Sequence, residues 1–300
     1  MKYIPLKKIL TLSLGLSVAA LLPQVAQSQN VNVQFESAGD LSSFNQVTGA
    51  DAVSTDMTFS SAGGTGGSGG LIHSVSGAVD ATAIYTPTSF DLSSGAAVTL
   101  SIDFLTGAGA PFAGSANAVV MLGLVGNTTT GFYSVNNATT GDNFVGGRIR
   151  HSGGTPGING LQSQTKLLNS AGTSSPADGS QLGMTFAANE WYRLTLSVTR
   201  TATANTFAYD LNLTDIGATG TSAPTTMANG DLSGNLVNAD LYNDSTAYAA
   251  FRGVNIASGN WDVAFDNFTV TVVPVPEPAS MSLAALGGLG MLLFARKQKR

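Results

Sequence analysis

Residues 193–214 read RLTLSVTRTATANTFAYDLNLT, and this stretch decides the fold class. Apolar and polar residues alternate strictly from 193 to 199 and alternate again from 207 to 214. A period of two places all the apolar side chains on one face of a half-buried strand. The polar link Thr203-Ala204-Asn205 between the two runs is typical of a tight turn. The stretch therefore predicts a β-hairpin with one buried face.

Other parts of the chain have the same β-like character. Residues 98–104 alternate strictly, and six further runs are rich in β-forming residues: 31–35, 83–85, 119–125, 144–149, 248–251 and 263–272. No segment between residues 31 and 273 keeps a sustained apolar period of 3.6 residues. Because a half-buried sheet needs a second apolar face against it, we predict an all-β, two-sheet antiparallel sandwich over residues 29–273.

The last predicted strand contains a change of phase. Val263 and Phe265 occupy odd positions, whereas Phe268 and the valines after it occupy even ones. The apolar face stays continuous only if the strand gains one residue at Asp266-Asn267, as it does in a β-bulge. We therefore predict a bulge that changes the direction of the Asp266 carboxylate.

Composition and charge narrow the class of protein. The chain has 300 residues, 36 glycines, no cysteine and a formal net charge of −5. The body from 29 to 273 holds six basic and 17 acidic residues, a net charge of −11. An acidic body repels phosphate backbones, so we expect no nucleic-acid partner.

The N-terminus predicts an export signal. Lysines precede an apolar run at residues 9–22, which is too short to cross a bilayer comfortably. Small residues then lead to a predicted cut between Ser28 and Gln29, with Ala26 at the third position before it. We expect signal peptidase to remove residues 1–28 as a signal peptide with a helical apolar segment.

The C-terminus combines three elements within residues 274–300. Pro276-Glu277-Pro278 cannot continue a central strand, because proline lacks the N–H donor. The uncharged residues 279–295 would form a helix of about 25 Å, near the lower limit for a membrane span. The basic tail at 296–300 then closes the chain with four charges, Arg296, Lys297, Lys299 and Arg300. The positive-inside rule keeps this tail in the cytoplasm and the body outside.

This three-part order resembles the PEP-CTERM sorting signal. The resemblance implies recognition by exosortase, an integral membrane protease of Gram-negative bacteria that make extracellular polysaccharide. It implies a protein exported across the inner membrane, held transiently by its C-terminal helix, and then released or attached at the cell surface. The alternative for the same segment is a permanent single-pass anchor.

The body resembles the concanavalin A-like (LamG-like) jelly rolls of exported bacterial proteins. The matching features are loose motifs spread over the body: Phe90-Asp91-Leu92, Glu190-Trp191-Tyr192-Arg193 and Phe265-Asp266-Asn267-Phe268. In related carbohydrate-binding jelly rolls, an acidic residue in the final strand and a glutamate near the first often bind structural calcium. The resemblance makes Glu36 and Asp266 the candidate calcium ligands. The alternative is an ordinary edge bulge with a solvated carboxylate.

Motifs for catalysis are sparse, so we expect no enzyme. The chain has no thiol and two histidines, which lie 78 positions apart. The glycine-rich tract at residues 64–70 formally matches nucleophile and dinucleotide motifs, but no helix follows it, and we predict a flexible loop. Laminarinase-like jelly rolls carry an E-x-D-x-x-E strand, and neither body glutamate, Glu36 or Glu190, begins that pattern.

The sequence favours two functional classes. The first is a non-catalytic surface or extracellular-matrix protein that associates with polysaccharide through aromatic platforms and polar groups. Its candidate binding residues are Trp191, Trp261, Tyr242, Tyr248, Asn243 and Asp244, and the alternative for both tryptophans is core packing. The second is a purely structural envelope or biofilm protein without a specific ligand. A glycoside hydrolase or lyase on a jelly-roll fold is a weaker third.

Overall fold

The computed structural model describes residues 29–48, 57–75, 79–92, 95–107, 118–127, 144–152, 158–164, 179–244, 246–255 and 261–273. These residues belong to one compact unit, Gln29–Val273. The predicted signal peptide and sorting segment lie outside the described residues. Within the described ranges, no helix has the length and apolar character needed to cross a membrane.

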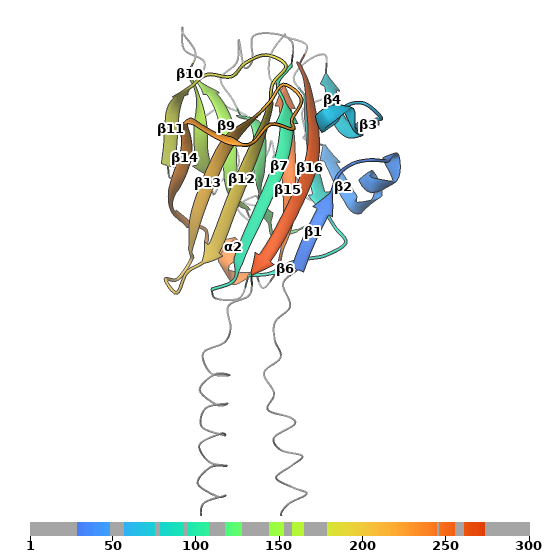
Figure 1. The fold of residues 1–300 in the computed structure, drawn as a ribbon. Coiled ribbons are helices and arrows are strands. Elements are labelled where there is room, and N and C mark those ends of the chain that lie inside the picture. Colours follow the sequence, from blue (N-terminus) through green and yellow to red (C-terminus); the bar gives the residue numbers. More distant parts are fainter. Residues whose placement is uncertain are drawn as a thin grey trace, which may run out of the picture. The chain divides into compact units, whose positions relative to one another are not determined.

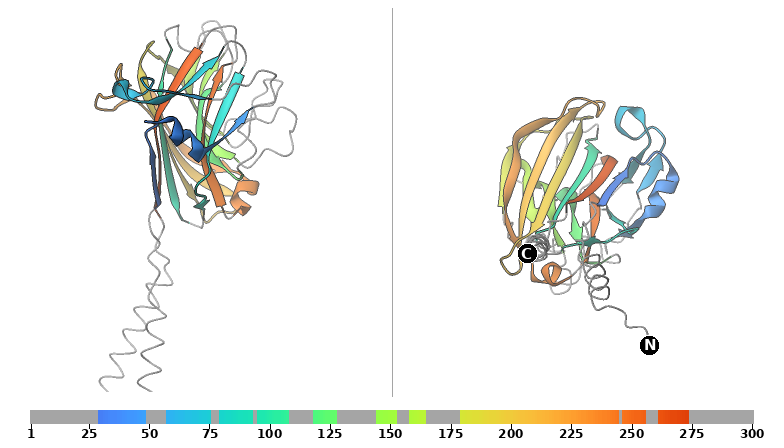
Figure 2. Two further views of the ribbon diagram at one scale, coloured as in Figure 1. Left: turned by 90° about the vertical axis from the view of Figure 1, so that its right-hand side faces the viewer. Right: turned by 60° about the horizontal axis from the view of Figure 1, so that its bottom comes forward.

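Two eight-stranded sheets stack face to face, and all strand pairs are antiparallel (Figures 1 and 2). Sheet 1 runs, in spatial order, β14 (Thr225–Val237), β13 (Thr206–Gly217), β12 (Trp191–Arg200), β7 (Ala97–Leu105), β16 (Trp261–Val273), β4 (Gly70–Val75) and β3 (Thr58–Ser60), with β1 (Gln29–Val33) also paired to β16. Sheet 2 runs β11 (Gly179–Met184), β10 (Ile158–Gln164), β9 (Phe144–Ser152), β8 (Ala118–Val125), β15 (Thr246–Asn255), β5 (Val79–Tyr85) and β2 (Phe44–Thr48), with β6 (Phe90–Asp91) paired to β15. The predicted all-β antiparallel sandwich is confirmed.

The predicted hairpin is β12 and β13. Leu194 pairs with Leu213 and Leu196 with Leu211, so the two apolar rows share one face. Asn205 has a φ of 60° in the connecting turn, a conformation that asparagine tolerates better than most residues. The alternation therefore fixes both the pairing register and the face that points inward.

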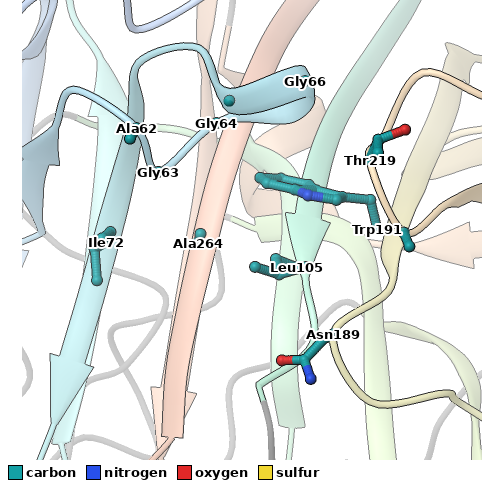
Figure 3. Close-up of a pocket in the computed structure, with 12 residues that line it drawn as sticks. Ala62, Gly63, Gly64, Gly66, Ile72, Leu105, Asn189, Trp191, Thr219 and Ala264 are labelled. Carbon is teal, nitrogen blue, oxygen red and sulfur yellow. The ribbon is translucent and has the colours of Figure 1, made fainter.

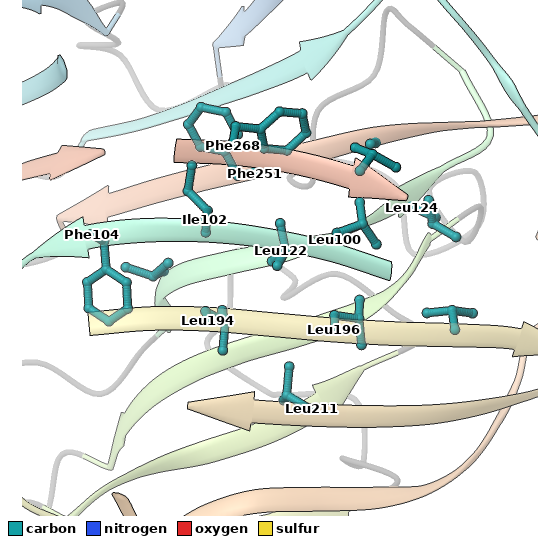
Figure 4. Close-up of a cluster of buried hydrophobic side chains, with 14 of the residues drawn as sticks. Leu100, Ile102, Phe104, Leu122, Leu124, Leu194, Leu196, Leu211, Phe251 and Phe268 are labelled. Atoms are coloured by element: carbon teal, nitrogen blue, oxygen red, sulfur yellow. The ribbon is translucent and has the colours of Figure 1, made fainter. Parts of the chain in front are cut away.

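The core lies between the sheets (Figure 4). Sheet 1 contributes leucines and isoleucine from β7 and β12, and sheet 2 contributes Leu122 and Leu124 from β8. Phe251 of β15 meets Phe268 of β16 across the gap, with ring centroids 5.4 Å apart. Each large side chain buried here contributes about 1.5–3 kcal/mol to stability. Because the apolar residues of each strand lie on the face toward the other sheet, the residues that alternate with them face outward.

Strand β16 contains the predicted bulge. Asp266 lies opposite Asp103 of β7, and Thr269 lies opposite Ser101, so β16 holds one extra residue between these pairs. Asn267 has a φ of 51° at this point. The extra residue keeps Phe265 and Phe268 both in the core, as the change of phase requires. Asp266 consequently faces the outer side of sheet 1.

Candidate functional site

A pocket opens on the outer side of sheet 1, where β7 ends and β12 begins (Figure 3). Its volume is about 520 Å³, within the range of small-molecule sites. Its lining comes from four strands and three loops: Ile72, Leu105, Trp191 and Ala264 on the strands, Ala62 and glycines of the 62–67 loop, Asn189 before β12, and Ala218 and Thr219 after β13. We call this cavity the Trp191 pocket.

Trp191 forms one wall of the pocket. It is the first residue of β12, and the next residue, Tyr192, turns into the core, so the indole points outward. Trp191 is only 4% exposed and packs with Ile216 and Ala264 in a small outer apolar cluster. Trp191 therefore both packs in this apolar cluster and lines the pocket. No described residue accepts a hydrogen bond from its indole N–H.

The glycine-rich tract forms the opposite wall. It contains a 3-10 turn, η2 (Thr65–Gly67), in which Gly66 has a φ of 64°. The Gly66 N–H donates to the Thr219 carbonyl at 2.6 Å, which joins the tract to the β13–β14 loop. A side chain at Gly64 would lie 1.9 Å from the Gly69 oxygen, so only glycine fits there. The predicted loop is present, and these contacts join it to the neighbouring segments; its flexibility stays a prediction.

Asp266 ties the tract to the sheet. Its Oδ2 accepts hydrogen bonds from the Thr65 N–H and hydroxyl, both at 2.9 Å, and from the Ser68 hydroxyl at 3.3 Å. Its Oδ1 accepts from the Asn267 N–H at 2.7 Å. Burial raises the pKa of the Asp266 carboxyl, and these hydrogen bonds offset part of that rise.

A second buried carboxylate lies beside the first. Arg193 donates to both oxygens of Asp103, at 2.6 and 2.8 Å. Asn267 donates its side-chain amide to Asp103 at 2.9 Å and to the Thr65 hydroxyl at 3.0 Å. The bulge residue therefore bridges both acidic side chains. The hydrogen bonds that Arg193 donates to Asp103, and then the charge of Asp103, raise the pKa of the guanidinium, although burial opposes the rise.

The candidate calcium ligands contact the same glycine tract. Gly69 donates its N–H to Glu36 Oε2 at 3.4 Å, while Asp266 binds Thr65 and Ser68. Among the described residues, no group of three His, Cys, Asp or Glu side chains could hold a metal ion. Calcium binding by Glu36 and Asp266 stays a prediction, and an ion at Asp266 would have to replace protein donors. The alternative of a solvated edge carboxylate is wrong, because Asp266 is 1% exposed on a strand paired on both sides.

The other predicted sugar-binding residues do not gather around Trp191. Tyr242 and Asn243 belong to the short helix α2 (Ala239–Asn243), and Asp244 follows it. The Tyr242 ring contacts the Arg200 guanidinium at 3.8 Å, at the far end of β12, about 30 Å of strand from Trp191.

Tyr248 and Trp261 lie on other strands. Tyr248 is on β15 of sheet 2, where it packs against a separate outer cluster. Trp261 begins β16 opposite Val75, and its side chain lies outside the described ones. The predicted set therefore divides, and among its members with described side chains Trp191 is the one that lines the pocket.

Sequence reasoning missed most of the residues that build the pocket. Thr65, Ser68 and Thr219 carry no motif, and their contacts join segments about 200 and 150 positions apart. Asn189 gave one usable signal, because an asparagine two residues before a predicted strand is typical of a turn with positive φ. Its φ is 55°.

Comparison with known proteins identifies the C-terminal segment and the fold. Residues 274–299 match the family model of the PEP-CTERM protein-sorting motif. No curated protein matches the sequence.

Solved structures with a similar fold include plant lectins. Peanut lectin with a 9mer peptide is 12% identical, with a TM-score of 0.53 over 83% of this chain and 100% of that chain. Basic winged bean lectin with Tn-antigen is 11% identical, with a TM-score of 0.52 over 82% and 99%. Winged bean acidic lectin with methyl-α-D-galactose is 10% identical, with a TM-score of 0.53 over 82% and 98%. Both resemblances, to the PEP-CTERM signal and to the concanavalin A-like jelly roll, are confirmed.

Proposed function

We propose that this chain is an exported, exosortase-sorted surface or extracellular-matrix protein of a Gram-negative bacterium, which associates with polysaccharide and has no catalytic activity. The observation that carries the proposal is the position of the sorting motif: it begins at residue 274, immediately after the last strand of a lectin-like sandwich ends at Val273. The body would then work outside the inner membrane.

The strand boundaries fit removal of both ends. Gln29, the predicted first residue after signal peptidase, is the first residue of β1. Pro276-Glu277-Pro278 follows β16 by two residues. Cleavage at these two points would leave every strand of both sheets whole. Before processing, the helix at 279–295 would span the membrane with the basic tail in the cytoplasm.

Polysaccharide association rests on the fold and on the Trp191 pocket. Two of the similar lectins were solved with a sugar or a sugar antigen, and an aromatic wall beside polar groups suits such ligands. The described residues that line the Trp191 pocket include no Asp, Glu or His. This lining supports binding over glycoside hydrolysis, which needs two carboxylates about 5–10 Å apart.

Intact mass after expression tests the sorting. In a Gram-negative host with exosortase, we expect a product that begins at Gln29 and has lost the apolar C-terminal helix. The triple substitution Pro276→Ala, Glu277→Ala and Pro278→Ala should retain that helix, whereas Pro274→Ala in the same segment should be processed normally. An unprocessed wild-type chain in the cytoplasm would contradict the proposal.

Glycan binding tests the polysaccharide association. We expect the full chain, held in a detergent without a sugar headgroup, to bind some members of a polysaccharide array. Uniform lack of binding would favour the purely structural alternative. Release of reducing sugar from the same polysaccharides would instead favour a hydrolase.

A further inference from the structure

We infer that the Trp191 pocket is the carbohydrate site and that it takes one uncharged sugar ring of the polysaccharide. This inference rests on the proposed polysaccharide association and adds the site and the charge class of the ligand. The apolar lining of the pocket would meet the apolar face of the ring, and the groups at the rim, with the indole N–H, would bind its hydroxyls.

The shape and the chemistry of the lining suit such a ring. Leu105 and Ala264 form a small apolar floor on the strands, and the indole of Trp191 extends over them toward the glycine turn (Figure 3). The glycines place backbone close to the cavity, because no side chain stands between. A sugar ring has an apolar C–H face and a polar edge, so it needs an apolar platform beside hydrogen-bonding groups.

Polar groups with free hydrogen-bonding capacity surround this apolar floor. No described residue bonds to the indole N–H of Trp191 or to the side-chain amide of Asn189. The Thr219 hydroxyl shares one hydrogen bond of 2.8 Å with Thr221, so two of its three hydrogen-bonding positions are left over. A purely apolar ligand would leave these groups unsatisfied, which is costly in a desolvated site. Sugar hydroxyls both donate and accept, so they can satisfy all three groups.

The charge around the pocket favours a neutral ligand. The residues that line it carry no charge. Glu190, between Asn189 and Trp191 in the sequence, places a negative charge near the pocket. The nearby arginine, Arg193, is already bound to Asp103. A uronic acid or a sulfated sugar would therefore find no free cation among the described residues here.

The glycine wall is held in place before any ligand arrives. Asp266 fixes Thr65 and Ser68, and the carbonyl of Thr219 fixes Gly66 from the other side. A wall that needs no ordering on binding reduces the entropic cost of association. Asp266 is thus a positioning residue for the pocket and does not line it.

The decisive variant removes the polar rim without disturbing the core. Asn189→Gly keeps the positive φ of that residue, and Thr219→Val keeps the shape and the carbonyl that binds Gly66. The matched control, Asn205→Gly with Thr203→Val, makes the same two changes in the β12–β13 turn, where Asn205 has a φ of 60°. Thr203 and Asn205 use their backbone carbonyls as acceptors, which both substitutions preserve. Thermal melting checks that both double variants are folded.

The probe is an array of glucose, galactose, mannose and N-acetylglucosamine oligosaccharides, with oligogalacturonate and alginate as acidic arms. We expect the wild type to bind a neutral member, the rim variant to bind it about tenfold or more weakly, and the control to match the wild type. Trp191→Phe, which retains a ring but lacks the N–H, should also weaken binding.

Three results would overturn the inference. Equal binding by the wild type and the rim variant would move the site elsewhere and leave the proposed polysaccharide association intact. A preference for the acidic arms would contradict the neutral ligand. No binding to any arm would contradict both the inference and the proposed association.

Discussion

Asp266 Oδ2 accepts two hydrogen bonds from Thr65, one from its N–H and one from its hydroxyl, each 2.9 Å long and spanning 201 positions of sequence. Thr65→Val keeps the volume of the side chain and removes only the hydroxyl. Because the acceptor is a buried carboxylate, we expect the free energy of unfolding to fall by about 2 kcal/mol, measured by urea titration. Thr65→Ser retains the hydroxyl and should recover most of the loss. Equal stability of Thr65→Val and the wild type would show that this hydroxyl does not hold the turn.

The bulge residue gives a test of backbone conformation. Asn267→Gly and Asn267→Ala both lose the two amide hydrogen bonds, but only alanine is strained at a φ of 51°. We expect the alanine variant to be less stable than the glycine variant by about 1 kcal/mol in urea unfolding. The control Ala208→Gly in β13 should show the opposite order, since glycine weakens an ordinary strand by about 0.5–1 kcal/mol. A glycine variant less stable than the alanine variant at 267 would contradict the bulge.

The Arg193–Asp103 pair should behave as a coupled unit. Asp103 is fully buried, whereas the Arg193 side chain is 36% exposed. Arg193→Met leaves a buried carboxylate without its cation, and we expect a loss of about 3 kcal/mol. Asp103→Asn removes the charge, so the double variant should lose less than the sum of the two single variants. Additive losses in this double-mutant cycle would mean that the interaction between the two side chains contributes little to the free energy of unfolding.

Asp210 predicts a pH dependence of stability. Asp210 lies on the exposed face of β13. Partial desolvation raises the pKa of its carboxyl, and the charge of Asp231 and a hydrogen bond with it raise the pKa further. Because the folded state binds this proton more tightly than the unfolded state, the resulting stability is present below about pH 4 and is lost as the pH rises through the raised pKa. Glu190 and Asp266 have pKa shifts of the same sign.

We therefore expect the melting temperature to fall as the pH rises from 4 to 7, and Asp210→Asn to reduce this slope. The control Asp240→Asn, in the exposed first turn of α2, should leave the slope unchanged. A slope that is the same in Asp210→Asn and the wild type would contradict the shifted pKa.

Calcium binding has a direct thermal test. If Glu36 and Asp266 hold the ion, binding adds to the free energy of unfolding. The melting temperature should then be higher in millimolar calcium chloride than in EDTA. Glu36→Gln should remove the difference, because a neutral amide is a weaker calcium ligand than a carboxylate. Equal melting temperatures for the wild type in both solutions would remove the calcium prediction.

The sequence was informative wherever one face of a strand is buried. Alternation around Leu194 and Leu211 predicted the β12–β13 hairpin, and the change of phase between Phe265 and Phe268 predicted the bulge. Strand β14 was not predicted, because its sequence TTMANGDLSGNLV buries few side chains and therefore shows no clear alternation. Its strand conformation depends on its pairing with β13. Edge strands of this kind have no period to detect.

The candidate site was harder to predict than the fold. Trp191 could be singled out because tryptophan is large and lies two residues before an alternating run. Its opposite wall depends on which strand lies beside β7, and that neighbour is the last strand of the body. Local patterns carry no information on this order, so the contact between Asp266 and the glycine tract could not be inferred from them.

The position of β16 has a consequence for the timing of folding. This strand is the last of the body to be synthesised, yet it lies inside sheet 1, between β7 on one side and β4 and β1 on the other. Until its 13 residues emerge, β7 has an open edge and β1 has no partner strand. Closing this gap needs contacts of very long sequence separation, which form slowly. The chain therefore cannot complete its native sheet before residue 273 has been made, and a nascent polypeptide that stays incompletely folded is a suitable substrate for a translocation channel.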